Sequence, residues 1–162
     1  QMGVMGFSAG GHLAASRGVL WDLPELGCRD GKNRPDALIL CYPVITSGEF
    51  AHRQSLQNVS GEADPDKQTF WSLETHVSGK TPPAFLWHTY EDDAVPVENS
   101  LLFVSALRRA GVSCEFHLFE QGVHGLSLCN VDVATPMRPT APWMDLCLTW
   151  LGNRFAFEEK PP

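Results

Sequence analysis

Short apolar runs recur along the chain and are separated by longer stretches in which apolar and polar residues mix. Residues 37–42, Ala-Leu-Ile-Leu-Cys-Tyr, contain no charged side chain, which is typical of a strand buried on both faces of a parallel sheet. Further strands are predicted at residues 4–7, 84–89 and 114–119, and helices at residues 9–19, 97–110 and 142–155. This alternation predicts an α/β fold with a mostly parallel sheet flanked by helices.

The stretch from residue 44 to residue 83 is polar and irregular, with short helices predicted near 53–58 and 65–73. A connection of this length between strands is more often a functional cap or a pocket wall than a plain loop. We therefore expect a single domain over residues 1–162 that carries a cap-like insertion at 44–83.

The first predicted strand leads into Gly6-Phe7-Ser8-Ala9-Gly10-Gly11, a G-x-S-x-G motif followed at once by an Ala-rich segment with helical spacing. Strand, sharp turn and helix form the context of a nucleophile elbow, in which the serine side chain stands clear of the sheet. Gly6 and Gly10 tolerate the strained turn, and Gly11 is expected to relieve crowding against the sheet. Ser8 is the predicted nucleophile, and the backbone N–H of Ala9 is a predicted donor to the oxyanion.

A catalytic serine needs a base, and six histidines are available. His88 and His117 fall inside predicted strands, where a histidine is usually a hydrogen-bonded structural residue. His124 lies in the Gly-flanked loop 121–125 beyond the end of a strand, where open α/β sheets place groups that face a ligand. His124 is therefore the predicted base.

Three acids in a row, Glu91-Asp92-Asp93, follow the predicted strand at 84–89. Acids in such a turn are usually only solvated, but one acid at the strand tip is placed to reach His124 and hold its ring in the required tautomer. With Asp92 in this role the chain order is Ser8, Asp92, His124, which is the order of an α/β-hydrolase.

Composition excludes several other classes of function. The net charge is −7 over 162 residues, and no cluster of Lys and Arg is present to neutralise phosphates, which argues against a nucleic-acid partner. No apolar run approaches the roughly 18 residues that span a bilayer. The cysteines form no C-x-x-C pair, so neither a zinc site nor a redox motif is supported, and their scatter favours a reducing compartment, the cytoplasm; they are Cys28, Cys41, Cys114, Cys129 and Cys147.

Several segments of the chain also match the motifs of one known family. They are Gly6-Phe7-Ser8-Ala9-Gly10-Gly11-His12-Leu13, Tyr42-Pro43-Val44-Ile45, Thr81-Pro82-Pro83, His88 to Asp92 with Val95-Pro96-Val97-Glu98-Asn99-Ser100, and Gly122-Val123-His124-Gly125. From the elbow to the closing helix, the chain resembles the acetyl esterase, or acetylxylan-esterase-like, branch of the α/β-hydrolases. The family pattern H-[GT]-x-x-D-x-x-V-P implies Asp92 as the triad acid, with Asp93, one residue out of register, as the fallback. The resemblance implies no metal and no organic cofactor.

The sequence departs from this family at its start. Family members carry further strands before the elbow and an H-G-G loop that supplies the second oxyanion donor, and this sequence, which begins at Gln1, has neither. We therefore expect a segment of a longer protein, with one bare sheet edge open to pairing with a second copy or a partner. Because loss of one oxyanion donor typically costs about 10²–10³ in turnover, the segment alone is expected to be weak, unstable or dependent on the missing half.

The resemblance implies a serine esterase that removes short acyl groups, above all acetyl groups on a sugar, through an acyl-enzyme. Its expected partner is a small-molecule or carbohydrate ester. Two alternatives remain open at this stage. A serine peptidase of the prolyl-oligopeptidase type shares the G-x-S-x-G-G motif and the triad order, and an inactive fragment or a non-catalytic binding domain would follow if the missing oxyanion loop abolished turnover.

Overall fold

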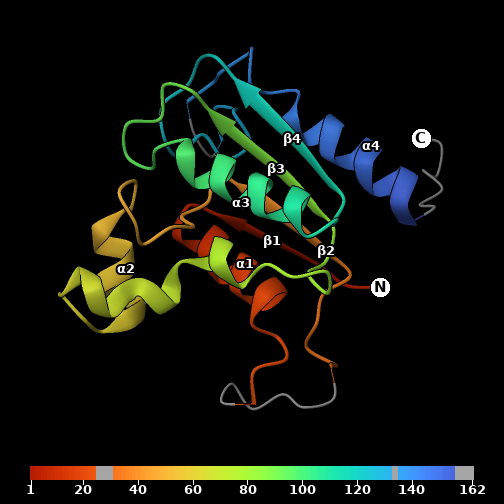
Figure 1. Cartoon of the computed structure of the whole chain (residues 1–162). Coiled ribbons are helices and arrows are strands. Elements are labelled where there is room, and N and C mark those ends of the chain that lie inside the picture. The colour runs from red at the N-terminus through yellow and green to blue at the C-terminus, as the bar shows by residue number, and fades with distance from the viewer. Residues whose placement is uncertain (25–30, 133–134, 156–162) are drawn as a thin grey trace.

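A computed structural model of the chain shows a parallel sheet with helices on both faces (Figure 1). It describes residues 1–24, 31–132 and 135–155. The strands of this described part are β1 (Gly3–Phe7), β2 (Ala37–Cys41), β3 (Ala84–Thr89) and β4 (Cys114–Phe119). They lie in the order β1-β2-β3-β4, and each strand pairs in parallel with its neighbour. The predicted α/β layout with a parallel sheet is confirmed.

Both faces of the sheet are covered by helices. These helices are α1 (Ala9–Val19), α3 (Glu98–Arg109) and α4 (Trp143–Phe155). Successive residues of a strand point to opposite faces. Leu38 and Leu40 of β2 therefore pack in one core with residues of α1 and α3, whereas Ile39 and Cys41 pack in a second core with residues of α4. The uninterrupted apolar run of β2 thus reflects a strand enclosed on both sides.

The stretch between β2 and β3 packs onto this body and projects to one side of it (Figure 1). Its elements are α2 (Arg53–Ser60), η2 (Pro65–Trp71) and η3 (Leu73–His76). The helix predicted near 65–73 is therefore a pair of short 3₁₀ helices that meet at Ser72, and not one α-helix. Leu56 of α2 is buried in a small cluster with Val44 and Val95. This cluster anchors the insertion, whose role as a cap stays a prediction.

The outer edge of β1 has no strand beside it within the described residues. Met2, just before this strand, is 44% exposed, and Met5, within the strand, is 42% exposed. An unpaired edge presents free backbone N–H and C=O groups to any further strand. That a second copy or a partner covers this edge stays a prediction.

The cysteines of the described residues are free thiols. Cys41, Cys129 and Cys147 are buried, and Cys114 is half-buried, whereas Cys28 lies outside the described residues. Burial raises the pKa of the Cys147 thiol to about 11. These side chains are therefore protonated and act as small apolar groups of the core.

Candidate active site

The turn from β1 into α1 holds Ser8 in a strained backbone conformation. Its φ and ψ are 54° and −121°, and a positive φ at a residue other than glycine persists only where the surroundings enforce it. Here the Ser8 N–H donates to the Cys41 carbonyl at 3.0 Å, and the Ser8 carbonyl accepts from the Val44 N–H at 3.0 Å. The end of β2 therefore fixes the elbow and presents the serine at the carboxyl edge of the sheet.

Two glycines of the motif are required by close packing. A Cβ at Gly6 would collide with the backbone of Gly10, and a Cβ at Gly11 would lie 2.7 Å from the Cβ of Pro43. The nearest neighbour of Gly11 is thus Pro43 in the loop after β2, and the carbonyl oxygen of Gly6 in β1 follows at 3.4 Å. At Gly10 a Cβ would meet nothing within 4 Å, so the steric argument made from the sequence does not extend to this position.

His124 comes from the loop after β4 and reaches the serine. Its Nε2 lies 2.8 Å from Ser8 Oγ. The Tyr42 ring packs edge-on against the imidazole, with 5.0 Å between ring centroids, and the Tyr42 hydroxyl accepts from the Ser127 N–H at 2.9 Å. Tyr42 itself has a φ of 37°. The end of β2 therefore supports the base as well as the nucleophile, a role of Tyr42 that no local sequence signal reveals.

Asp92 completes a continuous chain of hydrogen bonds with these two residues. Its Oδ2 accepts from His124 Nδ1 at 2.7 Å. Its Oδ1 accepts from the backbone N–H groups of Ala94 and Val95 at 3.1 and 2.9 Å. Asp92 is buried, whereas Asp93, the fallback acid, is exposed. Of the two candidate acids, the structure brings Asp92 to His124.

The hydrogen bonds around Asp92 keep its carboxylate ionised. Burial alone would raise the pKa of Asp92, but hydrogen bonds from His124, His88 and the Val95 N–H outweigh it and hold the pKa well below the usual range of an aspartate. An ionised Asp92 accepts the Nδ1 proton of His124. The free lone pair of the imidazole is then on Nε2, which faces Ser8.

The loops that carry the base and the acid are tied to each other at Gly122. The Thr89 hydroxyl donates to the Gly122 carbonyl at 2.7 Å. The Glu91 carboxylate accepts from the Gly122 N–H at 3.0 Å. Thr89 and Glu91 thus fix the approach of the His124 loop. The sequence analysis assigned no role to either, although both lie in the segment from His88 to Asp92 that matches the family motif.

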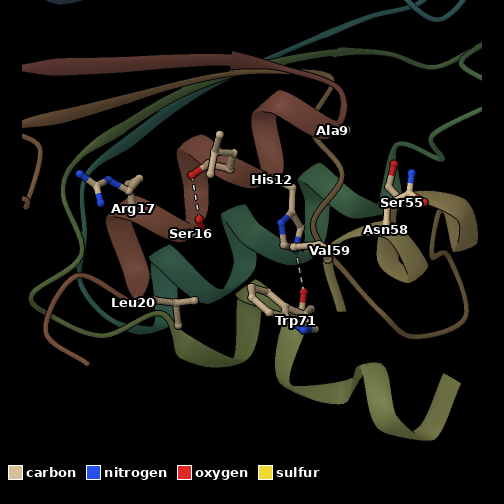
Figure 2. A pocket seen from close by; sticks show the side chains of 10 residues that line it. Ala9, His12, Ser16, Arg17, Leu20, Ser55, Asn58, Val59 and Trp71 are labelled. Carbon is tan, nitrogen blue, oxygen red and sulfur yellow. Dashed lines mark hydrogen bonds between the residues drawn. The ribbon is translucent and has the colours of Figure 1, made fainter. Parts of the chain in front are cut away.

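A cavity of about 560 Å³ lies beside the elbow, between α1 and the insertion. Ala9 and His12 line one side of it, and Val59 and Trp71 line the other. Figure 2 shows the His12 ring turned from α1 toward the Trp71 carbonyl, which lies 3.0 Å from its Nε2. Burial lowers the pKa of His12, although this hydrogen bond and the nearby Glu74 act in the opposite direction. His12 is therefore neutral and donates from Nε2.

The described residues contain no group of three or more His, Cys, Asp or Glu side chains arranged to hold a metal ion. Over the same ranges, no helix combines the length and apolarity that a bilayer crossing needs.

Comparison with known proteins places this chain in a family. Residues 39–149 match the model of the prolyl oligopeptidase family. The chain is 44% identical over 133 residues to endo-1,4-beta-xylanase B of Butyrivibrio fibrisolvens. The aligned stretch covers 78% of this chain and 21% of that protein. The chain is also 35% identical over 131 residues to an acetylxylan esterase of Xylanibacter ruminicola. This alignment covers 77% of this chain and 26% of that protein.

Solved structures show the same likeness. An acetyl ester-xyloside bifunctional hydrolase from Caldicellulosiruptor lactoaceticus superposes with a TM-score of 0.80 at 44% identity, over 94% of this chain and 56% of that chain. The chain thus spans about half of this solved structure and a smaller share of the two curated relatives. It belongs to the prolyl oligopeptidase family and has the α/β-hydrolase fold of its esterase relatives.

Proposed function

We propose that this chain carries the catalytic residues of a serine ester hydrolase that removes short acyl groups, acetyl above all, from carbohydrate. The observation that carries the proposal is the hydrogen-bonded chain from Ser8 Oγ through His124 to Asp92, with distances of 2.8 and 2.7 Å. Nucleophile, base and orienting acid are within the reach that acyl transfer requires.

In the proposed mechanism Ser8 Oγ attacks the ester carbonyl while His124 Nε2 takes the hydroxyl proton. Asp92 stabilises the imidazolium that forms, and the Ala9 N–H, at the start of α1, donates to the oxyanion. His124 then gives its proton to the departing alcohol. A water molecule, activated by the same imidazole, hydrolyses the acyl-enzyme and restores Ser8.

The proposed substrate class rests on the relatives and on the space beside the elbow. Two of the similar proteins are named as an acetylxylan esterase and an acetyl ester-xyloside hydrolase. The cavity of about 560 Å³ that begins at Ala9 is within the size range of small-molecule sites, roughly 300–1,000 Å³. Ser8, Asp92 and His124 are not among its lining residues, so the cavity meets the proposed catalytic residues only at Ala9, with the insertion forming one wall.

Hydrolysis of proline-containing peptides is the second candidate function, and the match to the prolyl oligopeptidase family model favours it. The triad geometry is shared by both reactions, because an ester and an amide present the same carbonyl to Ser8. The substrate therefore has to be settled by turnover.

The test compares the wild-type chain with Ser8→Ala on p-nitrophenyl acetate, longer p-nitrophenyl esters, acetylated xylo-oligosaccharide and a proline p-nitroanilide peptide. The proposal predicts acetyl release that falls with acyl length and disappears in Ser8→Ala. Cleavage of the peptide without ester preference would favour the peptidase. A folded wild-type chain that hydrolyses none of them would support an inactive fragment or a binding domain.

A further inference from the structure

His88 is fully buried at the end of β3, and every polar atom of its ring has a partner. Its side chain is 0% exposed. Nδ1 lies 2.8 Å from the hydroxyl of Ser100 on α3. Nε2 lies 2.9 Å from the Val95 carbonyl oxygen and 3.3 Å from Asp92 Oδ2. A buried imidazole held from two sides in this way has little freedom to rotate.

The partners determine where the ring proton sits. The Val95 carbonyl and the Asp92 carboxylate can only accept, so Nε2 carries a hydrogen and shares it between them. The Ser100 hydroxyl can donate or accept, so it can pair with Nδ1 at 2.8 Å once the partners of Nε2 have placed a hydrogen there. The Val95 carbonyl and the Asp92 carboxylate therefore set the Nε2–H that His88 directs toward the candidate acid, and Ser100 holds the other side of the ring.

The same contacts close a small ring around Asp92. The Val95 N–H donates to Asp92 Oδ1 at 2.9 Å, while the Val95 carbonyl accepts from His88. The carboxylate is thus held on its Oδ1 side by the loop backbone and on its Oδ2 side by His88. Its remaining acceptor direction, on Oδ2, is taken by His124 Nδ1 at 2.7 Å.

We propose that His88 is a positioning residue of the reaction proposed above: by sharing its Nε2–H between the Val95 carbonyl and Asp92 Oδ2, it holds the carboxylate against His124. His88 does not reach the serine or the reacting carbonyl. It acts through Asp92, and the inference therefore rests on the proposed role of Asp92 in catalysis.

Three variants test this role. His88→Leu removes both nitrogens at similar bulk, Ser100→Ala removes only the donor to Nδ1, and His88→Gln keeps an amide donor near Nε2. In His88→Leu we expect kcat to fall about 10- to 100-fold with KM little changed, because misplacing a catalytic group by an ångström costs on that order. Ser100→Ala should show a smaller loss of the same kind, and His88→Gln should recover part of the activity.

A spectroscopic readout separates positioning from folding and does not require turnover. The hydrogen-bonded Nδ1 proton of His124 gives a far-downfield proton resonance, identified by its absence from His124→Gln. We expect this resonance to broaden or disappear in folded His88→Leu and to return in His88→Gln. His117→Leu is the matched control, because His117 lies on the neighbouring strand β4, is half-buried and contacts Glu115 instead.

The outcomes distinguish this inference from the proposed function. A folded His88→Leu with wild-type kcat and an unchanged His124 resonance would overturn the positioning role. The same would follow if His117→Leu lost the resonance equally, since the effect would then not be specific to His88. A wild-type chain without turnover, in which His88→Leu still removes the resonance, would overturn the proposed function and support the positioning of Asp92.

Discussion

Replacing Asp92 by asparagine exchanges one carboxylate oxygen for an amide group at constant volume. The structure determines how the new side chain is oriented. On the Oδ1 side it faces two backbone donors, from Ala94 and Val95, and on the Oδ2 side it faces His124 and His88. Turning the amide nitrogen toward the backbone would leave both donors unpaired, at about 1–3 kcal/mol each. The amide oxygen therefore stays at the Oδ1 position.

The amide nitrogen then faces His124 Nδ1 and forces that atom to accept. The ring proton moves to Nε2, which points at Ser8 and can no longer take the hydroxyl proton. A wrong tautomer of this kind lowers kcat about 10⁴-fold in a serine triad, which corresponds to about 5.5 kcal/mol of activation free energy. The amide N–H₂ also faces the Nε2–H of His88, so that two donors meet. We expect this to lower the unfolding free energy by about 1–3 kcal/mol.

The assay measures kcat on p-nitrophenyl acetate, with the rate of Ser8→Ala subtracted as the blank. Urea unfolding of the same preparations measures their stability. Asp93→Asn is the matched control, because Asp93 is the exposed neighbour and the exchange is chemically identical. We expect Asp93→Asn to keep wild-type kcat. Retention of more than a tenth of wild-type kcat by folded Asp92→Asn, or a larger loss in Asp93→Asn, would refute the reasoning.

Three further predictions concern packing, support of the base and acid stability. Gly11→Ala should lower the unfolding free energy by about 1–3 kcal/mol, because the added Cβ collides with Pro43. In α4 a Cβ at Gly152 meets nothing within 4 Å, so Gly152→Ala should raise the unfolding free energy by about 0.5–1 kcal/mol. Equal urea midpoints for the two variants would contradict this. Tyr42→Phe removes the hydroxyl that accepts from the backbone of the His124 loop, and should lower kcat and cost about 1–3 kcal/mol of stability; unchanged urea midpoint and kcat would argue against it. Because folding lowers the pKa of Asp92, the ionised carboxylate stabilises the folded state above the unfolded pKa of about 3.9, and this stabilisation is lost as the pH falls toward the folded pKa. Between about pH 5 and pH 3 the unfolding free energy measured in urea should therefore fall more in the wild type than in Asp92→Asn.

Local patterns made much of the fold predictable. The helix after the elbow and the strands at 84–89 and 114–119 have the bounds that their residue patterns indicate. In each of them the apolar residues follow a single pattern from end to end. That His124 lies near Asp92 also follows from the sequence. Each comes just after a strand of a parallel sheet, and the carboxyl ends of such strands meet at one edge.

Features set by tertiary contacts were not predictable in the same way. Tyr42 has a positive φ and supports His124, yet tyrosine carries no local preference for that conformation. His88 was expected to be only a structural histidine, and its contact with Asp92 depends on how the loop folds back over the end of β3. The segment predicted as one helix near 65–73 divides into η2, which packs against α2, and η3, which packs against α1 and α3, and local pattern does not indicate these different neighbours.

The central claim is that Ser8 is a nucleophile activated by His124, and a fluorophosphonate probe tests it most directly. The wild-type chain, Ser8→Ala and His124→Ala are incubated with the probe, and the modified residue is located by mass spectrometry. We expect a single adduct on Ser8 in the wild type, none in Ser8→Ala, and greatly slowed labelling in His124→Ala. A folded wild-type chain that stays unlabelled, or equal labelling of Ser8→Ala, would contradict it.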